Sequence, residues 1–374
     1  MKIGIDFRPA LMSRAGIGRY TRGLVGGLGR LGSPVQFELY AHLVRRGRTE
    51  PGFRLGSGMR LHRGPVPARL LHVLGSLGYG CECHFGKVDL FHFTDFASLP
   101  FRRTPHVFTL HDVSFLVNPS WHEARAVEAL REVTGRLVGK ARIVFVHSHH
   151  TAREVAGMLK VEPDRIRVAP PGVGLGFFRD VKRDAIESVH RRLGLPPSYC
   201  LSLGTLEPRK NLPRLIRAFG RMHGHHPGLG LVLAGARGWL EKEVFAAVEM
   251  SPCRDCIHVV GQVEEGDLPA LYRGASAFAY VSLYEGFGLP VLEALASGVP
   301  AVVSRAASLP EAAGPAAVLV DPQDEAAIAD ALHRVLTEEP LREGLRRAGV
   351  EHARTFTWER TARITLDGYR EAVS

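Results

Sequence analysis

Short apolar runs, rich in Val and Ile, recur along the chain and are separated by amphipathic segments of helical length. Strands buried on both faces of a parallel sheet have this continuous apolar character, and the segments between them are the expected crossover helices. In the first half the predicted strands are Lys2–Asp6, Val35–Ala41, Val88–Phe93, Val107–Leu110 and Ile143–His147. In the second half they are Cys200–Leu203, Leu231–Ala234, Ile257–Val260, Ala277–Val281, Ala301–Ser304 and Val318–Val320. The pattern predicts an α/β protein with two Rossmann-like, doubly wound parallel sheets.

One segment between the two halves has neither periodicity. Residues 169–176, Ala-Pro-Pro-Gly-Val-Gly-Leu-Gly, concentrate proline and glycine, which interrupt helices and strands. We interpret this segment as an interdomain hinge, with a first domain over residues 1–175 and a second domain from residue 176. Residues 45–69 are rich in Gly, Pro and Arg and predict a mobile basic loop.

The composition is that of an ordinary globular protein. With 374 residues, 45% hydrophobic and 23% charged, the chain is long enough for two cores and too apolar to be mostly disordered. No run approaches the roughly 18 apolar residues of a membrane span. The beginning, Met-Lys-Ile-Gly-Ile-Asp, becomes charged too early for a secretory signal. Five cysteines do not make a disulfide framework, so we expect a cytoplasmic protein.

The net charge of +10 is concentrated in the first half. Residues 1–180 carry 26 Lys and Arg against 14 Asp and Glu, whereas residues 181–374 carry 22 against 24. A basic surface suits a phosphorylated ligand, an anionic membrane or nucleic acid. No zinc-finger spacing, aromatic RNA-binding motif or basic helix accompanies it. Because 41 of the 48 cationic residues are Arg, genome composition explains the excess equally well.

The sharpest motif is the segment Glu285-Gly-Phe-Gly288-Leu289-Pro-Val-Leu-Glu293. Pro suits the first turn of a helix, so Glu285 is expected in a loop at the carboxyl end of a strand and Glu293 in the first helical turn. A helix N-terminus attracts phosphate, and the carboxylates can accept hydroxyl hydrogens from a sugar and a ribose. The alternative is that Glu285 is a loop acid and Glu293 only complements the helix dipole.

A second motif follows the first predicted strand of the second half. The strand ends at Gly204, and the turn that follows presents Arg209 and Lys210 beside a helix start with Asn211 as its expected cap. Two adjacent cations at such a place predict an anion site. An isolated Arg-Lys pair is usually a solvated surface feature, but its placement beside Glu285 favours binding.

Two weaker motifs lie in the first half. Gly16 and Gly18 follow the first strand, where a Gly-x-Gly is more often a turn than a phosphate loop. Thr21 occupies the third glycine place of the dinucleotide fingerprint, which disfavours an oxidoreductase. His111 ends another strand. It either takes part in function or is a buried imidazole that Asp112 satisfies.

Metal ligands are not recognisable. Cys253 and Cys256 have CxxC spacing, but no second CxxC exists. The other candidate ligands belong to the other predicted domain: Cys81, Cys83 and His84. His149 and His150 lack ligand spacing, and Ser148 before them suits a helix cap. We expect unconnected thiols and no metal.

Together these motifs resemble glycosyltransferase family 4, a group of retaining enzymes of the GT-B fold marked by Glu-x7-Glu, which Glu285 and Glu293 match. Residues 203–211 look like the family segment whose Arg and Lys hold the donor pyrophosphate. Further matching segments extend the resemblance over nearly the whole chain: 15–20, 111–112, 257–263, 308–311 and 356–358. Residues 279–282 and 171–174 depart from the family pattern without removing a predicted catalytic group.

The resemblance implies two domains that face a cleft, with the closing helix 357–374 returning to the first domain and a donor domain over residues 176–356. It implies catalytic roles for His111, Arg209, Lys210 and Glu285, with His111 beside the transferred sugar. The implied donor contacts are Gly16, Gly18, Gly204, Val263, Gly288, Leu289 and Glu293. Among these, Gly16 and Gly18 would meet the diphosphate and Glu293 the ribose hydroxyls.

The overall pattern is most similar to mannosyltransferases that use GDP-mannose. Front-face substitution without an enzymatic nucleophile is the implied path. No Asp-x-Asp element is present, so we expect cations and a helix dipole to replace a metal. A glycan or polyprenyl-linked acceptor at an anionic membrane surface would suit the basic first half. The alternatives are a nucleotide-sugar epimerase of the same architecture and a non-catalytic protein that binds membrane or nucleic acid.

Overall fold

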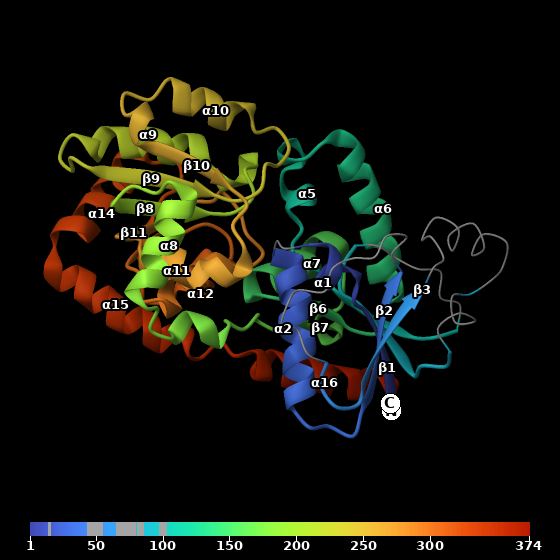
Figure 1. Cartoon of the computed structure of the whole chain (residues 1–374). Coiled ribbons are helices and arrows are strands. Elements are labelled where there is room, and N and C mark those ends of the chain that lie inside the picture. Colours follow the sequence, from blue (N-terminus) through green and yellow to red (C-terminus); the bar gives the residue numbers. More distant parts are fainter. Residues whose placement is uncertain (14–15, 43–54, 65–79, 81–85, 97–102) are drawn as a thin grey trace. The chain divides into compact units, whose positions relative to one another are not determined.

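The computed structural model describes residues 1–13, 16–42, 55–64, 80, 86–96 and 103–374. The chain divides into two compact units (Figure 1). Unit 1 contains Met1–Val117, Ala124–Gly172 and Thr357–Ser374, and unit 2 contains Asn118–Glu123 and Val173–Phe356. The boundary therefore lies three residues before the predicted one, and the short segment Asn118–Glu123 belongs to unit 2 rather than to the first domain.

In the described part of unit 1, seven parallel strands form one sheet with the order β3-β2-β1-β4-β5-β6-β7. The strands are β1 (Lys2–Asp6), β2 (Gln36–His42), β3 (Met59–Gly64), β4 (Leu90–Phe93), β5 (His106–Thr109), β6 (Val144–Val146) and β7 (Ile166–Val168). The predicted basic loop is thus wrong at Met59–Gly64, which pairs with β2 along its whole length. Residues 45–54 and 65–69 lie outside the described residues.

Alternating side chains fill two cores on the two faces of this sheet. Val107 of β5 and Phe145 of β6 join one core, whereas their neighbours Phe108 and Val144 join the other. The described helices of unit 1 are α1 (Arg8–Met12), α2 (Gly16–Arg30), α5 (Ser114–Val117), α6 (Ala124–Lys140), α7 (His149–Leu159) and α16 (Trp358–Val373). Helices α1, α2 and α16 supply the first core, and α6 and α7 supply the second.

The sheet of unit 2 has six parallel strands with the order β10-β9-β8-β11-β12-β13. Its strands are β8 (Ser198–Leu203), β9 (Leu229–Ala234), β10 (Ile257–Gly261), β11 (Ala277–Tyr280), β12 (Ala301–Ser304) and β13 (Val318–Val320). All six correspond to apolar runs that predict strands. The structure is two doubly wound α/β units, and this is the GT-B architecture expected from the sequence.

Helices cover both faces of the second sheet (Figure 1). They are α8 (Arg183–Leu193), α9 (Leu212–His223), α10 (Lys242–Glu249), α11 (Leu268–Arg273), α12 (Leu289–Ala296), α13 (Leu309–Ala313), α14 (Glu325–Thr337) and α15 (Glu339–Ala353). Cys200 of β8 packs with α9, α10 and α14, whereas its neighbour Leu201 packs with α8, α11 and α12. Each helix therefore buries its apolar stripe on one side of a sheet that is apolar on both.

Each sheet has one point at which the strand order reverses. In unit 1 it lies between β1 and β4, and in unit 2 it lies between β8 and β11. Connections diverge from these points to opposite faces, so the loops after the two strands leave a crevice at their carboxyl ends, where open α/β sheets bind ligands. In unit 2 the residues Arg209, Lys210 and Glu285 follow these two strands, whereas His111 of unit 1 follows β5, the neighbour of β4.

None of the described helices combines the length and the apolar character that a membrane span needs.

Two glycines on helices of unit 1 give opposite expectations for Gly→Ala. A Cβ at Gly18 of α2 would lie 1.9 Å from the backbone oxygen of Ser13, whereas a Cβ at Gly135 of α6 would meet nothing within 4 Å. We expect Gly18→Ala to lower the free energy of unfolding of unit 1 by about 1–3 kcal/mol through overpacking. Gly135→Ala should raise it by roughly 0.5–1 kcal/mol because alanine favours a helix. Urea unfolding of both variants measures the two signs, and equal effects would contradict the packing described for α2.

Candidate active site

The loops after β8 and β11 meet at the switch point of unit 2. After β8 a short 3-10 turn, Pro208–Lys210, presents Arg209 and Lys210. The backbone N–H of Leu283, in the loop after β11, donates to the Arg209 carbonyl oxygen at 2.9 Å. Arg209 also donates to the carbonyl oxygen of Tyr284 at 3.0 Å. These bonds hold the two loops together and bring the two sequence motifs to one place.

Glu285 binds both predicted cations at once. Arg209 donates to one carboxylate oxygen at 2.6 Å, and Lys210 donates to the other at 2.7 Å. Glu285 is only 6% exposed, and the two cationic side chains are 13% and 11% exposed. Arg209 makes a second bond of 2.6 Å to Glu207. The result is a nearly buried group of two cations and two carboxylates. Glu285 is a loop residue as predicted, but Arg209 and Lys210 are not a solvated surface pair.

The charges in this cluster keep Glu285 ionised. Burial on its own would raise the pKa of the carboxyl, but attraction to Arg209 and Lys210 and the hydrogen bonds to it lower the pKa to about 2. Tyr280 at the end of β11 lies beside them, and burial, reinforced by the charge of Glu285, raises its pKa well above the ordinary value. The phenol is therefore neutral, and Lys210 donates to its oxygen at 2.7 Å.

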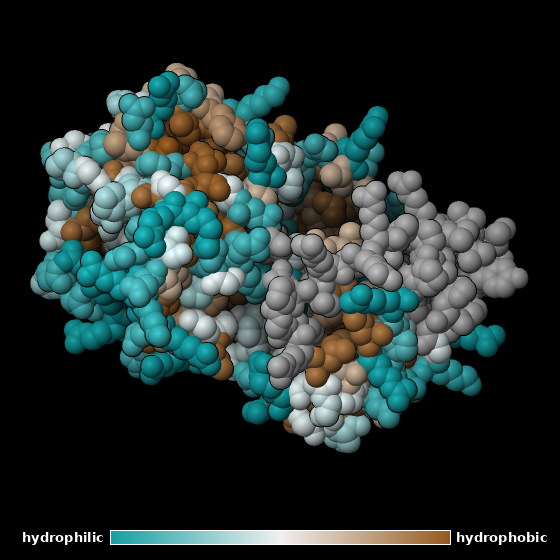
Figure 2. Space-filling view, in the orientation of Figure 1, coloured by the Kyte–Doolittle hydropathy of each residue, from teal (hydrophilic) through white to brown (hydrophobic). Residues whose placement is uncertain are grey.

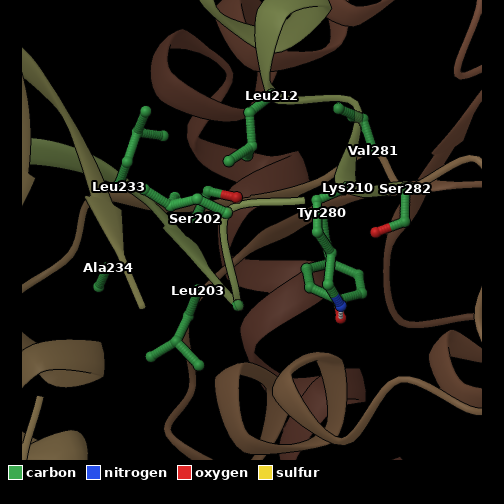
Figure 3. Close-up of a pocket in the computed structure, with 11 residues that line it drawn as sticks. Ser202, Leu203, Lys210, Leu212, Leu233, Ala234, Tyr280, Val281 and Ser282 are labelled. Atoms are coloured by element: carbon green, nitrogen blue, oxygen red, sulfur yellow. Dashed lines mark hydrogen bonds between the residues drawn. The ribbon is translucent and has the colours of Figure 1, made fainter. Parts of the chain in front are cut away.

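Figure 3 shows Lys210 and Tyr280 next to each other at the wall of a small cavity between β8, β9 and β11. The ammonium of Lys210 lies 5.0 Å from the centre of the Tyr280 ring, a distance at which the ring attracts a cation. The cavity has a volume of about 10 Å³, close to that of one water molecule. Lys210 is thus fixed by Glu285 and by the phenol oxygen.

Glycines near the cluster make room for its parts. A Cβ at Gly204 would lie 3.0 Å from Cε of Lys210. Gly288 has φ +111°, and a Cβ there would lie 2.7 Å from Leu309. Gly288 precedes α12, and half-buried Leu289 is the first residue of that helix. Val263 follows β10, an edge strand that β9 separates from β8, and it packs against the core that includes Tyr280.

Glu293 departs from its expected place. It belongs to the second turn of α12 rather than the first, and it is 1% exposed. The hydroxyl of Tyr272 on α11 donates to its carboxylate at 3.0 Å. The helix begins at Leu289, so Pro290 is its second residue and Glu293 its fifth.

Ser308, the first residue of the matching segment 308–311, is a second support of the cluster, a contact that the sequence did not predict. It is fully buried, and its hydroxyl donates to the carbonyl oxygen of Glu285 at 2.7 Å. Asn211 also differs from expectation. It adopts a left-handed conformation before α9 and its side chain makes no cap. Its amide instead donates to the carbonyl oxygens of Val281 and Pro322 at 3.0 and 2.7 Å, which ties β8 to the loops after β11 and β13.

At the switch point of unit 1, His111 follows β5. One ring nitrogen lies 2.8 Å from the carbonyl oxygen of Thr94, and the other lies 2.9 Å from a nitrogen of His147. Asp112 is not its partner, because Asp112 accepts from the backbone and hydroxyl of Ser114 at 2.9 and 2.7 Å. His147, which the sequence analysis treated only as the end of a strand, is therefore the residue that orients His111.

The protons of this histidine pair can be counted. Three contacts each need one proton: His111 with the carbonyl oxygen of Thr94, His111 with His147, and His147 with the carbonyl oxygen of Ala169. Two neutral imidazoles supply only two protons. Burial lowers the pKa of His111, and burial together with the neighbouring His111 lowers the pKa of His147 to about 3, so the pair is neutral. The contact to Ala169 is the longest, at 3.3 Å, and is the one without a proton. His147 then donates to His111, which donates to Thr94.

The remaining predicted residues are placed as follows. Gly16 begins α2, and the close approach of Ser13 accounts for Gly18 without a ligand. Ser148 caps α7, because its hydroxyl accepts from the N–H of Thr151 at 3.0 Å. Cys253 and Cys256 are free thiols. Cys81, Cys83 and His84 lie outside the described residues, and within those residues no group of three or more potential ligands is arranged to hold a metal.

Comparison with known proteins places this geometry in a family. Residues 14–177 match the family described as Glycosyltransferase Family 4, and residues 186–352 match Glycosyl transferases group 1. The chain is 31% identical over 276 residues to O-antigen chain mannosyltransferase B from Escherichia coli, covering 73% of this chain and 72% of that protein. The chain belongs to glycosyltransferase family 4. It is therefore a glycosyltransferase.

Two further proteins are similar to this chain. D-inositol 3-phosphate glycosyltransferase from Acidothermus cellulolyticus is 33% identical over 284 residues, which cover 72% of this chain and 62% of that protein. A crystal structure of HepE from Anabaena in complex with UDP-glucose matches with a TM-score of 0.75 and 15% identity, over 99% of both chains. The latter likeness shows a common fold.

Neutralising Glu285 tests the charge cluster. We expect Glu285→Gln to lower the free energy of unfolding of unit 2 by about 2–4 kcal/mol at pH 7, because it leaves two nearly buried cations with one carboxylate. The exposed pair Arg183–Glu187 provides the control Glu187→Gln, which should cost less than about 1 kcal/mol. The carboxylate of Glu285 stabilises above its unfolded pKa, so the difference between wild type and Glu285→Gln should shrink as the pH falls from 4.5 toward 2. A difference that is constant with pH in urea unfolding would contradict the charge assignment.

A buried histidine makes unit 1 sensitive to acid. His92 of β4 lies between Thr109 and Tyr369, and burial lowers its pKa from 6.5 to about 3. The unfolded chain then binds more protons between these values, so stability is complete above pH 6.5 and falls below it, by up to about 1.4 kcal/mol per pH unit for one group. His92→Gln should lower the slope of the unfolding free energy against pH by the contribution of one proton, up to about 1.4 kcal/mol per pH unit. Trp358 fluorescence in a Trp121→Phe/Trp239→Phe background reports unit 1, and an unchanged slope would contradict the burial of a neutral imidazole.

Proposed function

We propose that this glycosyltransferase moves a hexose, mannose, from GDP-mannose to a glycan or a lipid-linked acceptor, with retention of configuration and without a metal. The observation that carries the proposal is the cluster of Arg209, Lys210 and Glu285 at the switch point of unit 2. The choice of mannose is supported by the relationship to O-antigen chain mannosyltransferase B. The name of that relative also supports a role in cell-surface polysaccharide synthesis.

In this proposal the donor diphosphate lies against Arg209 and Lys210. Both cations are already oriented by Glu285, and Arg209 is oriented by Glu207 as well. Prearranged charges act on a developing negative charge without reorganising, which is the main source of electrostatic catalysis. Two fixed cations also replace the charge that a divalent ion would bring to a diphosphate.

The transfer proceeds on one face of the sugar. The bond between the anomeric carbon and the departing β-phosphate oxygen breaks, the acceptor oxygen forms a bond to the same carbon, and the acceptor proton passes to the departing phosphate oxygen. Arg209 and Lys210 offset the charge of the leaving diphosphate. Glu285 does not serve as nucleophile, because a carboxylate whose pKa is about 2 and whose two oxygens hold cations is a poor one. It accepts hydrogen bonds from donor sugar hydroxyls.

The other donor contacts in the proposal follow the family resemblance. His111 lies beside the sugar as a neutral imidazole that His147 orients, and Glu293 accepts from ribose hydroxyls through the carboxylate that Tyr272 holds. Gly16 and Gly18 meet the diphosphate, while Gly204, Val263, Gly288 and Leu289 surround the nucleotide. These assignments are independent of the Arg209 and Lys210 roles and can be tested one at a time.

The acceptor side of the proposal rests on charge. The surplus of cations in residues 1–180 would attract a phosphate-bearing acceptor and the anionic inner face of a cell membrane, with the protein peripheral to it. The relationship to D-inositol 3-phosphate glycosyltransferase supports a second acceptor class, a small phosphorylated polyol. Both acceptors carry phosphate, so the test uses both.

Nucleotide binding gives the first test. Calorimetry and thermal shift with GDP, UDP, ADP, GDP-mannose and UDP-glucose, each with Mg²⁺ and with EDTA, should show selective stabilisation by GDP and GDP-mannose that does not depend on the metal. Lys210→Met should weaken this binding at least ten-fold, whereas the control Lys242→Met at the exposed start of α10 should not change it. Binding of none of the nucleotides would overturn the donor site. Selective binding of UDP would overturn the mannose donor while leaving transfer intact.

Product analysis separates transfer from its rivals. GDP-mannose incubated with the enzyme and a polyprenyl-diphosphate glycan, or with inositol 3-phosphate, should give a glycoside with the anomeric configuration of the donor. The donor incubated alone should keep its sugar configuration. Conversion of the donor sugar without an acceptor would identify an epimerase, and an inverted product would overturn the same-face mechanism.

A further inference from the structure

A basic cavity of about 770 Å³ lies in unit 2, away from the charge cluster. Its walls include Ala275 and Val299, which precede β11 and β12, whereas Arg209, Lys210 and Glu285 follow β8 and β11. In a parallel sheet, residues before the strands and residues after them lie at opposite edges. The cavity is therefore a feature separate from the candidate donor site.

Four arginines line this cavity. Arg273 is the last residue of α11, Arg346 and Arg347 are on α15, and Arg354 follows that helix. Arg346 and Arg347 lie four and three positions before Val350, and Arg354 lies four positions after it, which puts these residues on one side of the helix. Glu351 is the single acidic residue in the lining. Figure 2 shows that the surface over α8 and α15 is mainly hydrophilic.

Much of this positive charge has no counterpart. Arg346 is paired with Glu343 at 2.6 Å, and Arg273 lies 3.9 Å from the fully exposed Asp180. The guanidinium groups of Arg347 and Arg354 have neither an ion pair nor a hydrogen bond to any residue that the structure describes. Attraction to helix C-terminal carbonyls accounts for Arg273 and Arg354. It does not account for Arg347, which lies two turns before the end of α15.

Two buried polar atoms in the wall also lack partners. Ser297, which follows α12, is 1% exposed, and its hydroxyl oxygen makes no hydrogen bond to any described residue. The same is true of Nε of Arg273. Gly298 next to Ser297 adds no side chain to the wall of the cavity. A Cβ there would lie 3.8 Å from Arg273 and from Val350. Unsatisfied buried donors are rare in native proteins and indicate a missing partner.

We propose that this cavity is a second anion site, which binds the phosphate group of a small phosphate ester. Guanidinium groups recognise phosphate through paired N–H donors, which the four arginines of the wall supply. The volume is that of a small-molecule site, and Ala275, Val299 and Val350 offer apolar wall to the organic part of the ester. The inference does not rest on the proposed transfer reaction.

The test uses inorganic pyrophosphate and glycerol 3-phosphate as probes. Calorimetry should show binding to the wild-type protein that weakens at least ten-fold in Arg347→Gln/Arg354→Gln. Both arginines are exposed, so the variant should keep its fold and its unfolding transition. The control Arg183→Gln/Arg334→Gln removes the same two charges from exposed positions elsewhere in unit 2 and should bind as the wild type does.

Hydrogen exchange locates the bound probe. Residues 297–299 and 346–354 should gain protection with pyrophosphate. An equal loss of affinity in the control variant would show that the probes bind by general electrostatic attraction, and it would overturn the proposal. Protection confined to residues 204–211 and 283–293 would assign all binding to the donor site and also overturn it.

Vesicles distinguish the source of the phosphate. Sedimentation with phosphatidylglycerol vesicles that depends on Arg347 and Arg354, without binding of the soluble probes, would identify the phosphate as a lipid headgroup. Binding of the soluble esters with no such dependence on vesicles would identify a free metabolite. Absence of both would overturn the proposal.

Discussion

The arrangement of unit 2 depends on one buried carboxylate. Glu285 lies in the loop after β11, yet its two oxygens hold cations from the turn after β8, and its backbone oxygen holds Ser308 from a third segment. Removing such charges from water is costly, and the cost is recovered only where each charge has a partner at short range. Three separate loops must therefore reach their positions together. The carboxyl edge of the sheet is fixed before any ligand arrives.

At its own switch point, unit 1 buries neutral groups instead of charged ones. At its switch point the chain of contacts runs from His147 to His111 and on to the carbonyl oxygen of Thr94, whose hydroxyl donates to the carbonyl oxygen of Asp6 at 2.6 Å. The Tyr20 ring lies 5.2 Å from that of His111 and 4.6 Å from that of His147. Two neutral imidazoles avoid the desolvation cost of a charge but lose their hydrogen-bond pattern when protonated. The two units therefore differ in how acid affects them.

The apolar runs predicted every strand that is covered on both sides, and the strands that escaped prediction are the two edges of the first sheet. β3, Met-Arg-Leu-His-Arg-Gly, alternates apolar and polar residues because an edge strand is partly exposed, and β7 has only three residues. The cluster of Arg209, Lys210 and Glu285 was predicted from the positions of the two motifs after strands and from the family resemblance. The partners of His147 and Ser308 could not be predicted, because they are decided by long-range packing. Glu293 was misplaced by one residue, from the fourth to the fifth position of the helix, because proline occupies either of the first two helical positions.

Helix α12 links the two sites of unit 2. It begins directly after Gly288, shortly after Glu285, and it is followed by Ser297 in the wall of the basic cavity. Its eight residues span about 12 Å. Energetic coupling through such an element requires two alternative packings of it. Residues 291–296 are all buried and pack against α13 and α15, and a close-packed helix cannot slide without displacing its neighbours. Binding of an anion in the cavity should therefore leave α12 in place, and the affinities of the two sites should be independent of each other.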